Sequence, residues 1–108
     1  MSRYVTNMEQ FRKLTAEERR KLDSENSKWF EQFKKAKATD KIIELINDTK
    51  SPYCLCCIAE FLEEQAKLID SKDPTEHFDG FIAQTNIKVC FYKLRRLEQE
   101  QQWSLQEN

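Results

Sequence analysis

The sequence predicts an all-α protein, a single domain over residues 1–108 that folds as a small bundle of four to five helices. The chain of 108 residues is long enough for one core and too short for two. One glycine and two prolines leave few positions for the tight turns that join β-strands. Apolar residues instead recur every three or four positions, as on the buried face of a helix. The two ends, 1–6 and about 103–108, are expected to be frayed.

Two capping-box sequences mark the first helix starts. Thr6–Glu9 and Thr15–Glu18 each place a glutamate three residues after a threonine, a spacing at which the two side chains cap each other's backbone. We therefore expect a short helix over about 7–13 and a longer one over about 16–37. The polar segment 23–27 is the point at which the longer helix is expected to break or restart. Its apolar stripe consists of Leu22, Trp29, Phe33 and Ala36.

The next two helices form the middle of the chain. Thr39 or Asp40 is predicted to cap a short helix that ends near Asn47. Pro52 then begins the most apolar helix, because proline is favoured at the first helical position behind a serine cap. This helix is expected to end near Ser71 and to be the most buried of the bundle. Its predicted core face holds Leu55, Ile58, Leu62, Ala66 and Ile69.

The last helix is predicted to begin at Pro74, behind an Asp73 cap, and to run to about Gln102. We expect it to cover the 52–71 helix through one apolar face. That face is predicted to hold Phe78, Phe81, Ile82, Thr85, Val89 and Tyr92, with Cys90, Leu94 and Leu97 beside it.

Composition excludes several classes of protein. The longest apolar run, 54–59, has six residues, whereas a membrane span needs about 20. The N-terminus has no apolar segment of the kind found in signal peptides. A single glycine excludes the glycine-rich phosphate loops of nucleotide-binding enzymes. We expect a cytoplasmic protein without a bound cofactor, in a reducing compartment where its four cysteines remain thiols.

The cysteines offer the one candidate metal site. Cys54 and Cys57 have the spacing of a zinc ligand pair, and His77 and Cys90 would complete a set of four. The pair falls on a predicted apolar helix, however, where cysteine packs as a small hydrophobic residue. We therefore predict reduced, packed thiols and no metal, with a small metal or thiol protein as the third functional alternative. No catalytic pair is predicted either, so we expect a protein that is not an enzyme.

The segment 28–37 is the predicted functional surface. It interleaves aromatic residues with lysines, as helices that bind nucleic acid or lie on membrane surfaces do. The chain as a whole carries a net charge of −1, which argues against a dedicated nucleic-acid binder. We therefore expect a protein–protein interaction module, either a regulator, an adaptor or an inhibitor, with nucleic-acid binding as the alternative. The predicted surface residues are Met8, Phe11, Lys28, Phe30, Lys34, Lys35 and Lys37.

Self-association is predicted as well. Residues 1–41 hold 11 Lys and Arg against 7 Asp and Glu, whereas residues 42–87 hold 3 against 9. These segments can neutralise each other within one chain or between two copies. Met8, Phe11 and Phe30 have no place on the predicted core stripe, which leaves an apolar patch for a second copy. We predict a homodimer, with a monomer as the alternative.

Overall fold

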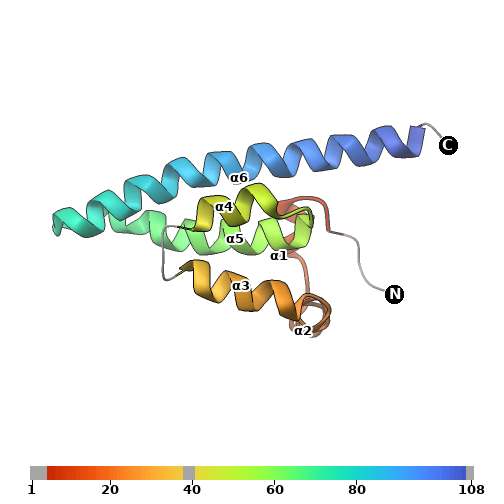
Figure 1. Cartoon of the computed structure of the whole chain (residues 1–108), viewed down its shortest axis with the longest axis horizontal. Coiled ribbons are helices and arrows are strands. Elements are labelled where there is room, and N and C mark those ends of the chain that lie inside the picture. Colours follow the sequence, from red (N-terminus) through yellow and green to blue (C-terminus); the bar gives the residue numbers. More distant parts are fainter. Residues whose placement is uncertain (1–4, 38–40, 107–108) are drawn as a thin grey trace.

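Six α-helices and one turn of 3-10 helix follow one another in the computed structural model, and no strand occurs in the residues that it describes, 5–37 and 41–106 (Figure 1). For residues 37 and 101–106 it describes the backbone alone. The all-α prediction is confirmed, and the predicted count of four to five helices is too low. The elements are α1 (Met8–Arg12), α2 (Ala16–Glu25), α3 (Ser27–Lys37), α4 (Ile42–Asp48), α5 (Pro52–Ala66), the 3-10 turn η1 (Lys67–Asp70) and α6 (Pro74–Gln106).

The additional helix arises at Asn26, inside the segment where a break was expected. The Asn26 backbone N–H is shared between the carbonyls of Leu22 and Asp23, at 3.2 Å from each. Its side-chain amide also donates to the Leu22 carbonyl, at 2.8 Å. Asparagine competes in this way with the regular helical hydrogen bonds. The chain therefore leaves α2 at Asn26 and begins α3 at the next residue.

Three predicted caps are present, whereas α1 is capped by Asn7, which accepts from the Gln10 N–H at 2.9 Å, and not by the predicted Thr6. Thr15 and Glu18 form both hydrogen bonds of a capping box at the start of α2. The Ser51 hydroxyl accepts from the Cys54 N–H at 3.4 Å, and Pro52 follows as the first residue of α5. Asp73 accepts from the Thr75 N–H at 2.8 Å, at the start of α6. The predicted cap of the short middle helix, residue 39 or 40, lies outside the described residues.

Helix α5 forms the centre of the bundle, as expected. Every residue from Tyr53 to Ala59 is buried, and so is Leu62. Figure 1 shows α4 and α5 between the long α6 on one side and α3 on the other. None of the helices in the described part of the chain combines the length and the apolar character needed to cross a membrane.

The N-terminal segment belongs to the core. Val5, Met8, Phe11 and Leu14 are all buried, so the expected fraying does not extend to Val5. The Phe11 ring lies 5.7 Å from the ring of Tyr53 on α5, measured between centroids. The short α1 thus folds back over the bundle, and it places Met8 and Phe11 inside the core rather than on a surface open to partners.

Helix α6 faces the core with the side opposite to the predicted one. Gly80, Ala83, Asn86, Cys90 and Leu94 are buried. The face predicted to be buried is exposed instead: Phe78, Phe81 and Tyr92 keep 60%, 56% and 68% of their surfaces in solvent. The prediction for this face was therefore wrong, although the pairing of α6 with α5 is confirmed.

Small side chains explain this orientation. A Cβ atom placed on Gly80 would lie 2.2 Å from the backbone nitrogen of Ile69 and 2.7 Å from the carbonyl carbon of Leu68. The backbones of α6 and η1 therefore approach more closely than any side chain at this position permits. Phenylalanine and tyrosine are too large for such a contact, so the helix turns its small residues inward.

The length of α6 determines the outline of the molecule. A helix of 33 residues extends for about 50 Å at 1.5 Å per residue, which matches the longest dimension of the structure, 52 Å. Figure 1 shows its C-terminal end extending past the other helices. The side of α6 turned away from α4 and α5 faces no other described element (Figure 1).

Candidate interaction surface

The outward face of α6 carries a continuous apolar strip. We call it the α6 stripe and define it as Phe78, Phe81, Ile82, Thr85, Val89 and Tyr92. All six side chains are exposed. The Thr85 hydroxyl donates to the Phe81 carbonyl at 3.2 Å, so it requires no hydrogen bond from outside the helix. Monomeric proteins seldom leave contiguous apolar side chains in water without a partner that covers them.

Positive charges border the α6 stripe. Lys88 and Arg95 are exposed and stand seven residues apart, which places them on one edge of the helix face. Arg96 is exposed at its C-terminal end. Glu76 stands seven residues before the buried Ala83, and Asp79 stands seven before the buried Asn86. Residues seven apart lie on nearly the same side of a helix, so both carboxylates lie toward the core side. The stripe therefore has Lys88 and Arg95 along one edge, while Arg96 at its C-terminal end forms an ion pair with Glu100, at 3.7 Å.

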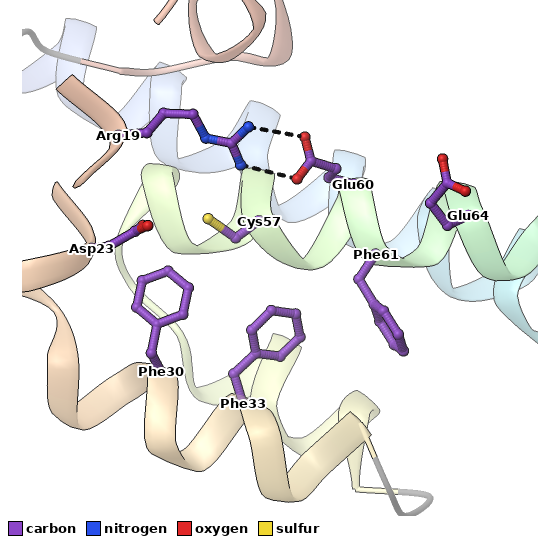
Figure 2. Close-up of a pocket in the computed structure, with 8 residues that line it drawn as sticks. All are labelled: Arg19, Asp23, Phe30, Phe33, Cys57, Glu60, Phe61 and Glu64. Atoms are coloured by element: carbon purple, nitrogen blue, oxygen red, sulfur yellow. Dashed lines mark hydrogen bonds and ion pairs between the residues drawn. The ribbon is translucent and has the colours of Figure 1, made fainter. Parts of the chain in front are cut away.

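A second feature is an aromatic cleft of about 310 Å³ between α2, α3 and α5 (Figure 2). Figure 2 shows Phe30 and Phe33 rising from α3 toward α5, with Phe61 extending from α5 in the opposite direction. The Arg19 guanidinium spans the upper edge and donates to both carboxylate oxygens of Glu60, at 2.9 and 3.4 Å. The remaining lining residues are Asp23, Cys57 and Glu64.

The polar groups of this cleft are engaged within the protein. Asp23 accepts a hydrogen bond from the Tyr53 hydroxyl at 2.5 Å, and Glu64 accepts from the Lys67 ammonium at 3.1 Å. Burial, the largest cause, and the bond to Asp23 both raise the pKa of Tyr53 above its ordinary value. The contacts across the cleft therefore fasten α2 and α3 to α5.

All four cysteines are free thiols and all are buried. Burial raises the pKa of Cys56, Cys57 and Cys90 to about 12, and it also raises the pKa of Cys54. The Cys90 thiol donates to the Leu55 carbonyl at 3.1 Å, which joins α6 to α5. Because thiolates are the nucleophiles and metal ligands, protonated thiols of this kind are poor at both tasks.

The candidate zinc ligands do not come together. His77 is exposed at the start of α6, where its Nδ1 atom lies 2.6 Å from the Ile69 carbonyl oxygen. Cys54, Cys57 and Cys90 lie in the core. Among residues 5–37 and 41–106, no three His, Cys, Asp or Glu side chains are grouped as a metal site would require.

The aromatic residues of the 28–37 segment pack against the bundle. Phe33 is buried, and its ring meets the ring of Phe61 edge-on at 5.8 Å. The Trp29 indole N–H donates to the Thr49 hydroxyl at 3.0 Å, which fixes α3 to the end of α4. Phe30 is half-buried and meets the Trp29 ring edge-on at 4.8 Å. These rings hold the bundle together, so they do not form an open platform for stacking.

The lysines of that segment lie on its solvent side. Lys28, Lys34 and Lys35 are exposed, while the side chain of Lys37 lies outside the described residues. Of the predicted surface residues, these three lysines and Phe30 are therefore accessible in part or in full. Met8 and Phe11, as described above, are in the core.

The sequence analysis named the residues of the α6 stripe but assigned them to the core, so it did not identify the stripe as a surface. The helix carries apolar residues on two faces, and the larger ones were assigned to the core. The signal that identifies the inner face is small size: Gly80, Ala83 and Cys90 recur at spacings of three and seven. Small residues at helical spacing mark a close helix contact, whereas large ones need more room.

Comparison of the chain with protein-family models, curated proteins and solved structures finds no match. The candidate surface is therefore identified by its own geometry. Among the features described, the α6 stripe alone combines extended apolar exposure with exposed cations, Lys88 and Arg95, along one edge.

Proposed function

We propose that this protein is a non-enzymatic protein–protein interaction module, a regulator, adaptor or inhibitor that binds through the α6 stripe. One observation carries the proposal: α6 turns Phe78, Phe81 and Tyr92 to solvent, while Gly80, Ala83 and Cys90 lie against the core. Burial of apolar surface contributes about 25 cal/mol per Å², so covering such a strip with a partner is favourable. Four reduced thiols in the core support a reducing compartment, the cytoplasm, as the place of action.

The chemistry of the described side chains favours binding over catalysis. The thiols are protonated in the core, and His77 is directed to a backbone carbonyl. A nucleophile requires a base within hydrogen-bonding reach, and no hydrogen bond described above joins His77 to a thiol. An interaction module needs none of these groups, because its affinity comes from buried apolar area and complementary charge.

Position-specific photo-crosslinking tests the proposal. A photo-reactive phenylalanine analogue replaces Phe81 in the α6 stripe, and in a matched control it replaces the exposed Lys21 on α2. In extracts of cells that express the protein, we expect covalent adducts from position 81 and few from position 21. The adducts should disappear when Tyr92 is changed to Glu in the same chain. Equal adducts from both positions, or none from position 81, would contradict the proposal.

Nucleic-acid binding through Lys28, Lys34 and Lys35 is the alternative. The exposure of these lysines supports it, whereas the packing of Trp29 and Phe33 removes the aromatic partners that single strands stack on. A salt titration of RNA and DNA binding decides the question. Affinity that falls steeply with salt and is lost in a Lys28→Glu/Lys34→Glu variant would establish the alternative in place of the proposal.

A homodimer stays a prediction. Burial of Met8 and Phe11 removes the apolar patch that was expected to form it. Two ion pairs, Arg12 with Glu63 and Arg19 with Glu60, also join the basic first third to the acidic middle within one chain. Sedimentation equilibrium at micromolar concentration tests the point, since a species of 13.0 kDa throughout would exclude the dimer.

A further inference from the structure

We propose that the α6 stripe receives one amphipathic helix of a partner protein, and that this partner helix carries carboxylates along the edges of its own apolar seam. The inference rests on the proposed function and adds the chemistry of the partner. Three features of α6 carry it: the spacing of the stripe, its length, and the charges beside it.

The spacing is that of a helix–helix seam. Phe78, Ile82, Thr85, Val89 and Tyr92 follow at intervals of four, three, four and three residues. This alternation is the 3.5-residue repeat with which two helices interlock side chains along a shared line. The β-branched Ile82 and Val89 occupy equivalent positions of the repeat, which is usual in such seams.

The length and the surroundings of the stripe fit a single helix of four turns. From Phe78 to Tyr92 the helix rises about 21 Å, at 1.5 Å per residue. Figure 1 shows no other described element on the outer side of α6, so a helix can lie along it without meeting the rest of the bundle. A partner segment of about 15 residues would cover the stripe from end to end.

The flanking charges define the partner. Lys88 and Arg95 lie exposed on one edge of the seam, and Arg96, which pairs with Glu100 at 3.7 Å, lies at its C-terminal end. In paired helices, side chains at the seam edges face those of the other helix, and opposite charges there select the partner. Carboxylates on the incoming helix would therefore meet these cations.

The same charges disfavour a second copy of this chain. Lys88 lies within one turn of the middle of the stripe, so an antiparallel pair of α6 helices would bring the Lys88 side chains of the two copies close together. A parallel pair would bring the Arg96 side chains together. Like charges opposite one another weaken an interface and are a common means of excluding a partner.

A lipid surface fits the stripe less well than a helix does. Helices that lie on membranes present a wide apolar face and rely on attraction between basic residues and anionic lipid. The α6 seam includes the polar Thr85, and the chain as a whole carries a net charge of −1. We therefore infer a protein helix rather than a membrane, and vesicle binding enters as an outcome of the test.

Two synthetic peptides serve as probes. The acidic probe is three repeats of Ile-Ala-Ala-Leu-Glu-Gln-Glu, which places Glu on both edges of an apolar seam, and the basic probe has Lys in place of each Glu. Repulsion between like charges keeps each probe from pairing with itself. Binding of labelled probe to the full chain is followed by fluorescence anisotropy. We expect the acidic probe to bind roughly ten-fold more tightly than the basic one, and more weakly as salt rises.

Three variants locate the binding. Lys88→Glu/Arg95→Glu should reverse the preference between probes, whereas Lys28→Glu/Lys34→Glu, which changes net charge equally on α3, should leave it unchanged. Phe81→Glu/Tyr92→Glu should abolish binding of the acidic probe. All of these positions are exposed, so circular dichroism and thermal melts should match those of the unaltered chain.

Five results of the binding measurements would overturn the inference. Equal affinity for the two probes, or loss of binding in the α3 control, would exclude an acidic partner helix. The proposed function would still stand if position 81 crosslinks. Dimers of the chain that Phe81→Glu dissociates would identify a second copy as the occupant. Preference for phosphatidylserine vesicles over the acidic probe would identify a membrane. Failure of both probes to bind would also overturn the inference. Absence of crosslinks from position 81 would overturn the proposed function as well.

Discussion

Gly80 is the residue at which α6 comes closest to the rest of the chain. Its Cα faces the backbone of Leu68 and Ile69, and backbone atoms cannot move aside as the end of a flexible side chain can. Glycine normally weakens a helix interior by about 1 kcal/mol relative to alanine. Its presence within α6 therefore reflects the contact with η1 rather than the needs of the helix itself.

We predict that Gly80→Ala lowers the free energy of unfolding by about 1–3 kcal/mol, even though alanine is the better helix former. The clash with Ile69 outweighs the gain in propensity. Urea denaturation followed by circular dichroism measures the change. Gln84→Ala, at an exposed position one turn further along α6, is the control and should alter stability by less than about 0.5 kcal/mol. Stabilisation by Gly80→Ala would show that the close contact does not exist.

The buried thiols make stability depend on pH in the alkaline range. Their pKa is about 12 for Cys56, Cys57 and Cys90 in the folded chain, against an ordinary value of 9.0. Above pH 9 the unfolded chain releases these protons while the folded chain keeps them, so the folded state binds more protons. The free energy of unfolding should therefore fall as pH rises from about 9 to 12, by up to about 1.4 kcal/mol per pH unit for each thiol.

Urea denaturation at a series of pH values checks this prediction. These thiols should cause no change in stability between pH 7 and 8, where they are protonated in both states. Cys90→Ala removes one titrating group, so its stability should decline less steeply above pH 9 than that of the unaltered chain. Identical slopes for the two proteins would mean that Cys90 ionises as readily when folded as when unfolded.

At the scale of elements, Lys93 joins α6 to α4. Its ammonium donates to the Ile46 carbonyl at 2.6 Å and to the Asn47 carbonyl, both near the C-terminus of α4. Carbonyls at a helix C-terminus lack intrahelical partners and carry partial negative charge, so a cation stabilises them. Partial burial, the largest cause, lowers the pKa of Lys93 from its ordinary value.

Lys93→Met should lower the free energy of unfolding by about 1–2 kcal/mol, because it removes two hydrogen bonds from a charged donor and keeps the length of the side chain. Chemical denaturation measures the loss. Arg96→Met is the matched control: Arg96 pairs only with the exposed Glu100 among the interactions described, at 3.7 Å, and its loss should cost less than about 0.5 kcal/mol. Equal effects of the two substitutions would argue against the contact between Lys93 and α4.

Local signals made most helix positions predictable. Caps at Thr15, Ser51 and Asp73 depend on a few neighbouring residues, and the structure has all three. The apolar character of 52–62 is sufficient to make it the central helix, because nothing else in the chain can cover so much apolar surface. Such features follow from short stretches of sequence and from composition.

The orientation of α6 could not be predicted in the same way. Both of its faces carry apolar residues, so periodicity identifies a helix without saying which face is inside. Which face is inside depends on two contacts, one between Gly80 and η1 and one between Cys90 and Leu55. Each contact joins segments that are separate in the sequence. Tyr92 was expected to be buried for this reason, whereas Met8 and Phe11 were expected to be exposed because the packing of α1 on α5 was not foreseen.

In the whole molecule, two arginines of the N-terminal helices are paired within the chain, and the cations beside the α6 stripe are exposed. The basic N-terminal helices meet the acidic α5 through Arg12 with Glu63 at 3.0 Å and Arg19 with Glu60 at 2.9 Å. Lys88, Arg95 and Arg96 lie exposed beside the α6 stripe, whereas Lys93 turns inward to α4. Opposite charges are thus paired internally on one side of the molecule, whereas on the α6 side the cations accompany exposed apolar surface.

In the isolated chain, α6 turns Phe78, Phe81 and Tyr92 to solvent and Leu94 to the core. Hydroxyl-radical footprinting with mass spectrometry measures this directly, on the monomeric protein at low concentration. We predict that the three aromatic residues are oxidised at nearly the rates found for the chain in denaturant, while Leu94 and Phe11 react much more slowly. Protection of Phe81 and Tyr92 together with rapid oxidation of Leu94 would contradict the orientation of α6, and with it the interaction surface.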